Sequence, residues 1–338
     1  MKKFNAGIAL LKIWMIYEVL VFHCWTTDDP TGGVTFFVFD ARLLAVPVFF
    51  MIAAYFGGTK VFSGEGFKKR SIRLLVPHIF WSVFFFVALI VFDKIFSTEY
   101  IHGISDLGIE LVTGGADYNV PLWFTVDLFL LTAIYLAIGK VIKNDTVKII
   151  IYSALGITGI AMQYAEVMVN ALMGQSEAVS YMLGRIPEML PFMSIGIIFA
   201  HFDVLNKLKK RWYITAIICA LVFVANYIYT FVPLVRHFWY GGLRTLILSL
   251  SLFVFFYVLP FDGISDKAKE IIAKLSAPVM GVYYIHYPIA EIFKDMIIPA
   301  DFAYNHVFIV ITLVFVICYA ISFLISLIPN SFVKKLVT

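Results

Sequence analysis

Ten apolar segments, each near the length needed to cross a bilayer, divide almost the whole of this 338-residue chain. Hydrophobic residues make up 62% of the sequence and charged residues 14%, whereas a soluble domain carries about 25% charged residues. The segments lie near residues 6–25, 41–58, 75–93, 121–140, 147–165, 188–202, 212–233, 243–260, 277–297 and 306–329. We therefore predict an all-α integral membrane protein, a polytopic bundle of about ten transmembrane helices. It forms a single transmembrane domain over residues 1–338, with no separate soluble domain.

The orientation of this bundle follows from its basic residues. Lysine and arginine gather in alternate connections, while the intervening connections are acidic or mixed. The positive-inside rule therefore places both termini in the cytoplasm. It also accounts for the net charge of +4, so no nucleic-acid partner is expected. The longest outward connections, near 94–120 and 166–187, are the natural place for short surface helices. The three cysteines have no metal spacing, and no metal is expected.

The first segment carries three ionisable side chains: Lys12, Glu18 and His23. A charge at the centre of a spanning helix costs roughly 2.5 to 3.5 kcal/mol on insertion scales, and such residues usually mark a functional site. Lys12 and His23 are about 16 Å and three turns apart, so both can face one side, with His23 toward the outside. A snorkelling lysine and an interfacial histidine are the simpler alternatives. Glu18 faces about 140° away from His23 and can pair with another helix.

A second polar cluster follows the second segment. Arg70 and Arg73 stand three residues apart, which makes them neighbours on one face of a helix. Two guanidinium groups suit phosphate, because they offer bidentate donors that never lose their charge. Ordinary cytoplasmic anchoring, or contact with anionic lipid, explains the same pattern.

Six motifs in order along the chain resemble the membrane-bound acyltransferase family 3. In the family's first helix a basic residue precedes a histidine by eleven positions; here Lys12 stands where arginine is usual, and His23 matches. The other five motifs are Val46–Gly58, with Ala53-Ala54 in place of Ser-Gly; Arg70-Ser-Ile-Arg73; Pro121-Leu-Trp123 through Asp127; Pro191–Gly196; and Tyr283-Tyr284-Ile-His286-Tyr-Pro288. Ala9 stands where the family often has an acid.

The resemblance implies a multi-pass acyltransferase of a bacterial cell membrane. Its donor is a cytoplasmic acyl-CoA, most often acetyl-CoA, and its acceptor is a hydroxyl of a cell-surface or lipid-linked saccharide. Lys12, Arg70 and Arg73 would hold the donor, whose pantetheine arm is of similar length to the Lys12-to-His23 span. His23 would be the general base, or an acyl-carrying nucleophile, because imidazole titrates near neutral pH.

Other polar and aromatic residues receive lower-ranked roles. Asp127 can orient His23 or bind the acceptor; a helix-end acid bonded to backbone or water is the alternative. Candidates for substrate binding are Glu18, Trp123, Tyr284, His286 and Glu291. Glu291 can instead pair Arg185, Arg236, Arg244 or Lys294, His286 can be a packed core histidine, and Trp123 can belong to the interfacial aromatic belt. A transporter or flippase for a lipid-linked or small anionic substrate is the alternative function, although the inverted repeats typical of transporters are absent from the sequence.

Overall fold

A computed structural model of the chain describes residues 4–24, 41–61, 64–115, 117–173, 177–229, 242–297 and 306–337. All regular secondary structure in these residues is helical. The chain forms two compact units. The first comprises residues 1–15, 43–68 and 130–273, and the second comprises residues 16–42, 69–129 and 274–338. The prediction of a single domain stays a prediction.

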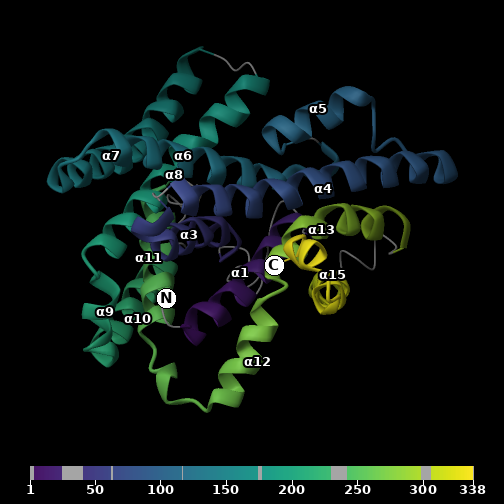
Figure 1. The fold of residues 1–338 in the computed structure, drawn as a ribbon. Coiled ribbons are helices and arrows are strands. Elements are labelled where there is room, and N and C mark those ends of the chain that lie inside the picture. Colours follow the sequence, from purple (N-terminus) through teal and green to yellow (C-terminus); the bar gives the residue numbers. More distant parts are fainter. Residues whose placement is uncertain are drawn as a thin grey trace. The chain divides into compact units, whose positions relative to one another are not determined.

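A helix lies at each of the ten predicted segments (Figure 1). These helices are α1 Ala6–Cys24, α3 Ala45–Val61, α4 Gly64–Phe96, α6 Trp123–Val141, α7 Asp145–Met173, α8 Glu177–His201, α10 Trp212–Tyr229, α11 Leu243–Val258, α13 Val279–Ile292 and α15 Val307–Leu327. In the described ranges, six helical stretches are long and apolar enough to cross a membrane, by length and composition. They are Ala6–Cys24, Gly66–Phe96, Ile104–Val141, Asp145–Met162, Leu243–Gly263 and Phe308–Leu327. The all-helical fold is confirmed for the described residues; ten crossings and cytoplasmic termini stay predictions.

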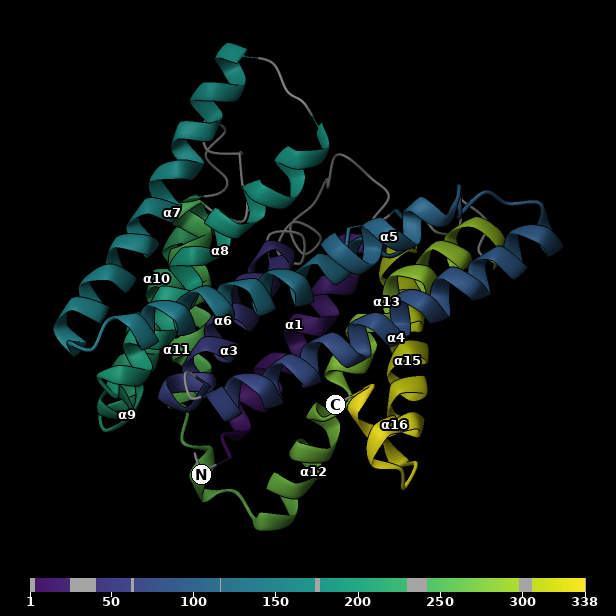
Figure 2. The same cartoon turned by 45° about the horizontal axis from the view of Figure 1, so that its top comes forward.

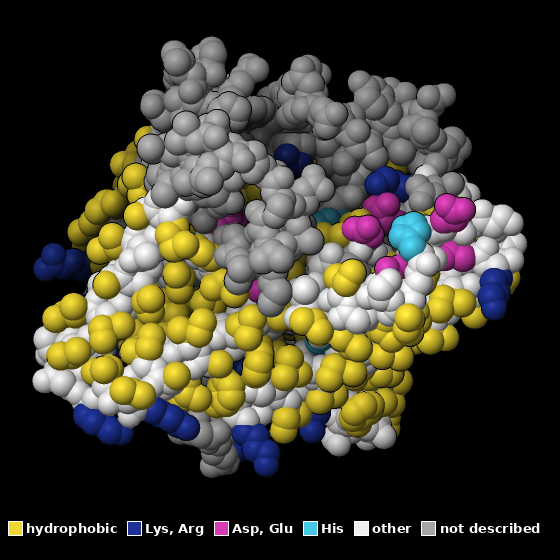
Figure 3. All heavy atoms as spheres, turned by 90° about the horizontal axis from the view of Figure 1, so that it is seen from above, with side chains coloured by type: hydrophobic (Ala, Val, Ile, Leu, Met, Phe, Trp, Pro, Cys, Tyr) yellow, Lys and Arg dark blue, Asp and Glu magenta, His cyan; other side chains and the backbone are white. Residues whose placement is uncertain are grey.

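Apolar side chains cover the outward faces of several of these helices, and Figure 3 shows a broad area of them on one face of the molecule. On α4 a series of exposed apolar residues recurs every four positions, which puts its members on one side of the helix. They are Ile79, Val83, Val87, Val91 and Ile95. A stripe of this kind is what lipid tails solvate, so α4 presents a membrane-facing side.

The sixth segment starts earlier than its prolines suggested. We expected a short helix beginning after Pro187 and Pro191, but α8 begins at Glu177 and contains both prolines. The neighbouring helix α7 offers glycine at the point of contact: a Cβ on Gly159 would meet the Pro191 ring at 2.9 Å. Membrane helices tolerate interior proline where neighbours pack around it. The helices α7 and α8 therefore occupy most of the region 166–187 that was predicted as an outward connection.

Small residues also bring α3 against α8 in the first unit. A Cβ on Gly196 of α8 would lie 2.6 Å from the Ala54 Cβ and 2.7 Å from the Met51 carbonyl oxygen. Close approach through small residues is how membrane helices maximise their packing. Ala54, which replaces the glycine of the family motif, therefore lies in a helix–helix contact.

We expect Gly196→Ala to lower thermal stability by about 1 to 3 kcal/mol, because the methyl group overpacks a contact with backbone on its far side. Gly108→Ala is the matched control: it lies on α5 (Ile104–Thr113), where an added Cβ meets nothing within 4 Å. Alanine there should be neutral or stabilise the helix. Thermal unfolding in detergent measures both variants, and equal unfolding temperatures would contradict the packing argument.

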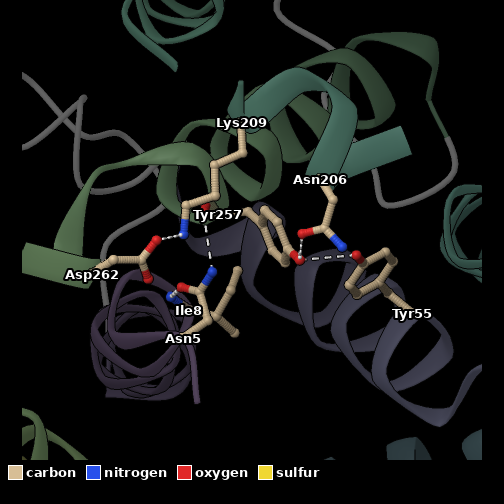
Figure 4. Close-up of polar contacts among 7 residues, drawn as sticks. All are labelled: Asn5, Ile8, Tyr55, Asn206, Lys209, Tyr257 and Asp262. Atoms are coloured by element: carbon tan, nitrogen blue, oxygen red, sulfur yellow. Dashed lines mark hydrogen bonds and ion pairs between the residues drawn. The ribbon is translucent and has the colours of Figure 1, made fainter. Parts of the chain in front are cut away.

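Polar contacts at one end of the first unit fix the start of α1 (Figure 4). The Asn5 side chain accepts a hydrogen bond from the Ile8 amide at 3.0 Å and donates to the Tyr257 carbonyl at 3.0 Å. This is the pattern of an N-capping asparagine. The Tyr257 hydroxyl in turn donates to Asn206 at 2.8 Å and accepts from the Tyr55 hydroxyl at 3.0 Å. These hydrogen bonds link α1, α3 and α11.

In the second unit α13 and α15 run side by side (Figure 2). The end of the described chain packs against the same unit. The Trp81 indole donates to the Leu336 carbonyl at 2.8 Å, and the Gly281 amide donates to the Val337 carbonyl at 3.0 Å. Gly281 lies in the first turn of α13, where amides have no partner inside the helix, so Val337 satisfies one of them.

The predicted surface region 94–120 contains the short helix α5, which ends at Gly114. Gly114 adopts a left-handed conformation with φ of 65°, and a Cβ there would lie 2.5 Å from the Leu122 backbone. Glycine is therefore required both for the conformation and for the close approach. This turn leads into η2 (Asp117–Leu122), which delivers the chain to the start of α6.

Candidate functional site

Helix α13 is the centre of the candidate site, because it carries a fully buried histidine and tyrosine. His286 is 0% exposed and Tyr284 is 1% exposed. The His286 Nδ1 lies 2.7 Å from the Tyr283 carbonyl oxygen. A carbonyl only accepts, so Nδ1 carries the proton and Nε2 is left as an acceptor. Among the residues that the structure describes, neither His286 Nε2 nor the Tyr284 hydroxyl has a hydrogen-bond partner.

His23, at the last turn of α1, lies directly against this helix. Its ring centre is 5.3 Å from that of His286 and 5.2 Å from that of Tyr287. The His23 side chain is only half-buried. The histidine of the first segment and the histidine of the ninth segment therefore form one pair, which sequence analysis had treated as separate candidates.

The arginine pair approaches the same helix from α4. Arg70 and Arg73 both lie within α4, so their predicted placement on one helix is confirmed. Their charges interact with each other, and Arg73 lies close enough to interact electrostatically with Tyr284. Arg70 is half-buried and Arg73 is exposed. Helix α13 is therefore contacted by His23 of α1 and interacts electrostatically with Arg73 of α4.

Contacts with η2 and the start of α6 hold α13 in place. The Asn119 side-chain amide donates to the Tyr284 carbonyl at 3.3 Å, and the Tyr283 hydroxyl donates to the Pro121 carbonyl. The rings of Phe124 and Tyr283 lie 5.3 Å apart with tilted edge-on geometry, a favourable arrangement for aromatic pairs. The segment that follows Gly114 therefore supports the helix that carries His286.

The other predicted residues lie on α1, α6 and α13. Glu18 and Asp127 are each 2% exposed, and Trp123 is buried at the start of α6. Glu291 forms an ion pair with Lys294 at 3.0 Å, which is one of the four partners considered for it. All of these residues belong to the second unit, whereas Lys12 lies on the part of α1 that belongs to the first.

Sequence reasoning missed three residues of this site. Tyr287 contacts His23, Asn119 supports Tyr284, and the Arg42 guanidinium lies 5.1 Å above the Phe22 ring, next to His23 in the chain. Arg42 did give a signal: it is a basic residue at the predicted outer end of the second segment, against the general charge pattern. Asn119 gave none, because a single amide in a connection is unremarkable.

Comparison with known proteins gives one clear match. A family model described as an acyltransferase domain, that of acyltransferase family 3, matches residues 5–327. This range includes α1, α4, η2, α6 and α13, which together carry the candidate site. No curated protein and no solved structure matches the chain.

Proposed function

Because the chain belongs to acyltransferase family 3 and is a membrane acyltransferase, we propose that it transfers an acetyl group from cytoplasmic acetyl-CoA to a hydroxyl of a cell-envelope saccharide. The acceptor is a lipid-linked or surface saccharide of a bacterial cell membrane. The proposal rests on the second unit, where residues from separate segments of the sequence meet on α13.

The observation that carries the proposal is the position of His23. It lies against His286 and Tyr287 at the end of α1, and it is only half-buried, so a substrate can reach it. A half-buried imidazole suits a general base, because its neutral form is the one that accepts a proton. The neighbouring Arg42 adds positive charge next to this end of α1.

The donor end of the proposal rests on α4. Arg70 and Arg73 offer two guanidinium groups on adjacent turns, and both positive charges are close enough to repel each other. Two like charges held together are stabilised by an anion between them, and the phosphates of CoA carry the required charge. The charge of Arg73 also acts electrostatically on Tyr284, which lies on the helix that contacts His23.

In the proposed reaction His23 removes the proton of the acceptor hydroxyl. The hydroxyl oxygen of the acceptor attacks the thioester carbonyl carbon at the same time. A new C–O ester bond forms and the C–S bond breaks. His23 then returns the proton to the departing thiolate, so the enzyme regains its starting state. Glu291 is already paired with Lys294, so we assign it a structural role at the outer end of α13.

A deletion strain tests this function. Mass spectrometry of its envelope glycans should show the loss of one acetyl group per repeating unit, and the parent gene should restore it. A complementing gene that carries His23→Ala should not restore it. Surface glycan that is missing altogether, rather than present without acetyl groups, would indicate a flippase. Unchanged acetylation throughout the envelope would reject the proposal.

A further inference from the structure

The two ring nitrogens of the buried His286 side chain differ in their hydrogen bonding. Its Nδ1–H donates to the backbone, at 2.7 Å to the Tyr283 carbonyl and 3.3 Å to the Val282 carbonyl, and its Nε2 is buried and has no partner among the described residues. A buried acceptor left unsatisfied costs about 1 to 3 kcal/mol. A buried unsatisfied polar atom therefore calls for an explanation, and a catalytic role is one of them.

His23 is the polar side chain placed to supply that donor. The two ring centres lie 5.3 Å apart and the rings are tilted by 55°. A ring nitrogen projects roughly 1 Å from its ring centre and an N–H hydrogen bond spans about 3 Å, so nitrogens that face each other at this separation are within hydrogen-bond reach. His23 is half-buried at the end of α1, and its ring can turn toward His286, whereas the His286 ring is fixed by its bond to the backbone.

We propose that His286 is a positioning residue: its Nε2 accepts the N–H of His23 and so fixes which nitrogen of His23 receives the acceptor proton. This inference rests on the proposed function of His23 as the base. With one nitrogen of His23 held as a donor to His286, the other nitrogen carries the lone pair and faces the acceptor. Because the Nδ1–H of His286 is bonded to the backbone, its Nε2 can only accept. His23 must therefore be the donor in the hydrogen bond between the two rings.

One proton moves during the proposed transfer. The acceptor hydroxyl gives its proton to the second ring nitrogen of His23, the one that does not face His286, as the C–O bond forms and the C–S bond breaks. The N–H toward His286 stays where it is, and His286 remains neutral throughout. The proton on His23 then passes to the thiolate. The hydrogen bond strengthens while His23 is an imidazolium, because charged donors make stronger bonds.

Two amide variants at position 286 separate positioning from packing. In His286→Gln the side-chain oxygen can take the place of Nε2, whereas in His286→Asn the shorter side chain reaches only the place of Nδ1. The full-length protein in nanodiscs is treated with diethylpyrocarbonate, which modifies neutral imidazole nitrogen, and labelling at His23 is read by peptide mass spectrometry. The exposed residues His102, His201 and His306 serve as internal references. Slow hydrolysis of acetyl-CoA is measured in parallel.

We expect His286→Asn to lower both His23 labelling and acetyl-CoA hydrolysis by about tenfold, the value of one lost hydrogen bond. His286→Gln should restore most of both, with the thermal unfolding temperatures of the two variants equal. Unchanged His23 labelling in His286→Asn would overturn the proposal, as would equal loss in both variants. Labelling needs neither donor nor acceptor, so it tests the histidine pair even if the acetyl donor or saccharide acceptor is wrong.

Discussion

The His23→Ala variant is expected to lose acetyl transfer by about 10² to 10⁴, the usual worth of a positioned acid–base group. The imidazole takes the acceptor proton in the proposed reaction, and alanine has no group that can replace it. The protein should still fold, because His23 is half-buried and lies at a helix end. Transfer of radiolabelled acetyl groups to envelope glycan in membrane vesicles measures the loss.

His102→Ala is the matched control, because His102 is an exposed histidine in the same unit and should leave transfer unchanged. Incubation with donor alone separates the two roles considered for His23. A general base leaves no hydroxylamine-sensitive acetyl label on the protein, whereas an acyl-histidine leaves one. Parental transfer rates in His23→Ala would reject the assignment and shift it to His286.

Arg70→Ala and Arg73→Ala are each expected to weaken CoA binding by about 1.5 to 3 kcal/mol, or roughly 10- to 150-fold, the value of a hydrogen bond to a charged group. Lysine at either position should rescue binding only in part, since it keeps the charge and loses the bidentate geometry. Isothermal titration calorimetry with CoA on the purified protein measures the change.

Lys68→Ala provides the control for this pair. Lys68 lies on the same helix as Arg70, is exposed, and carries the same charge. If the arginines only anchor the chain in the cytoplasm, all three alanine variants will bind CoA as the parent does. If general positive charge attracts CoA, Lys68→Ala will lose as much affinity as the arginine variants. Only a loss confined to Arg70 and Arg73 supports a phosphate site.

The helices of this fold could be predicted because each one has a strong local signal. A run of apolar residues long enough to cross a bilayer forms a helix, since no other local structure satisfies its backbone in lipid. The start of α8 could not be predicted in the same way. Pro187 and Pro191 argue locally for a helix end, and the glycine of α7 that accommodates Pro191 is a tertiary partner.

Several members of the candidate site could be predicted from the sequence, but the contacts between them could not. His23 and the arginine pair stand out because charge is rare in apolar segments. That His23 meets His286 and Tyr287 depends on how α1 packs on α13, and nothing in either segment specifies that contact. The partner of Glu291 was among the four considered, and Lys294 lies only three residues away in the sequence, which is within reach of local reasoning.

The hydrogen bond between Trp81 and Leu336 has a consequence for biosynthesis. Helix α4 is made early, yet its indole N–H acquires this partner only after residue 336 has been synthesised. The Gly281 amide likewise acquires the Val337 carbonyl as its partner only after residue 337 has been synthesised. The unit that holds His23 and His286 therefore acquires these two hydrogen bonds only after residues 336 and 337 have been synthesised. One short segment, distant in the chain from both helices, thereby satisfies a polar group of α4 and a polar group of α13.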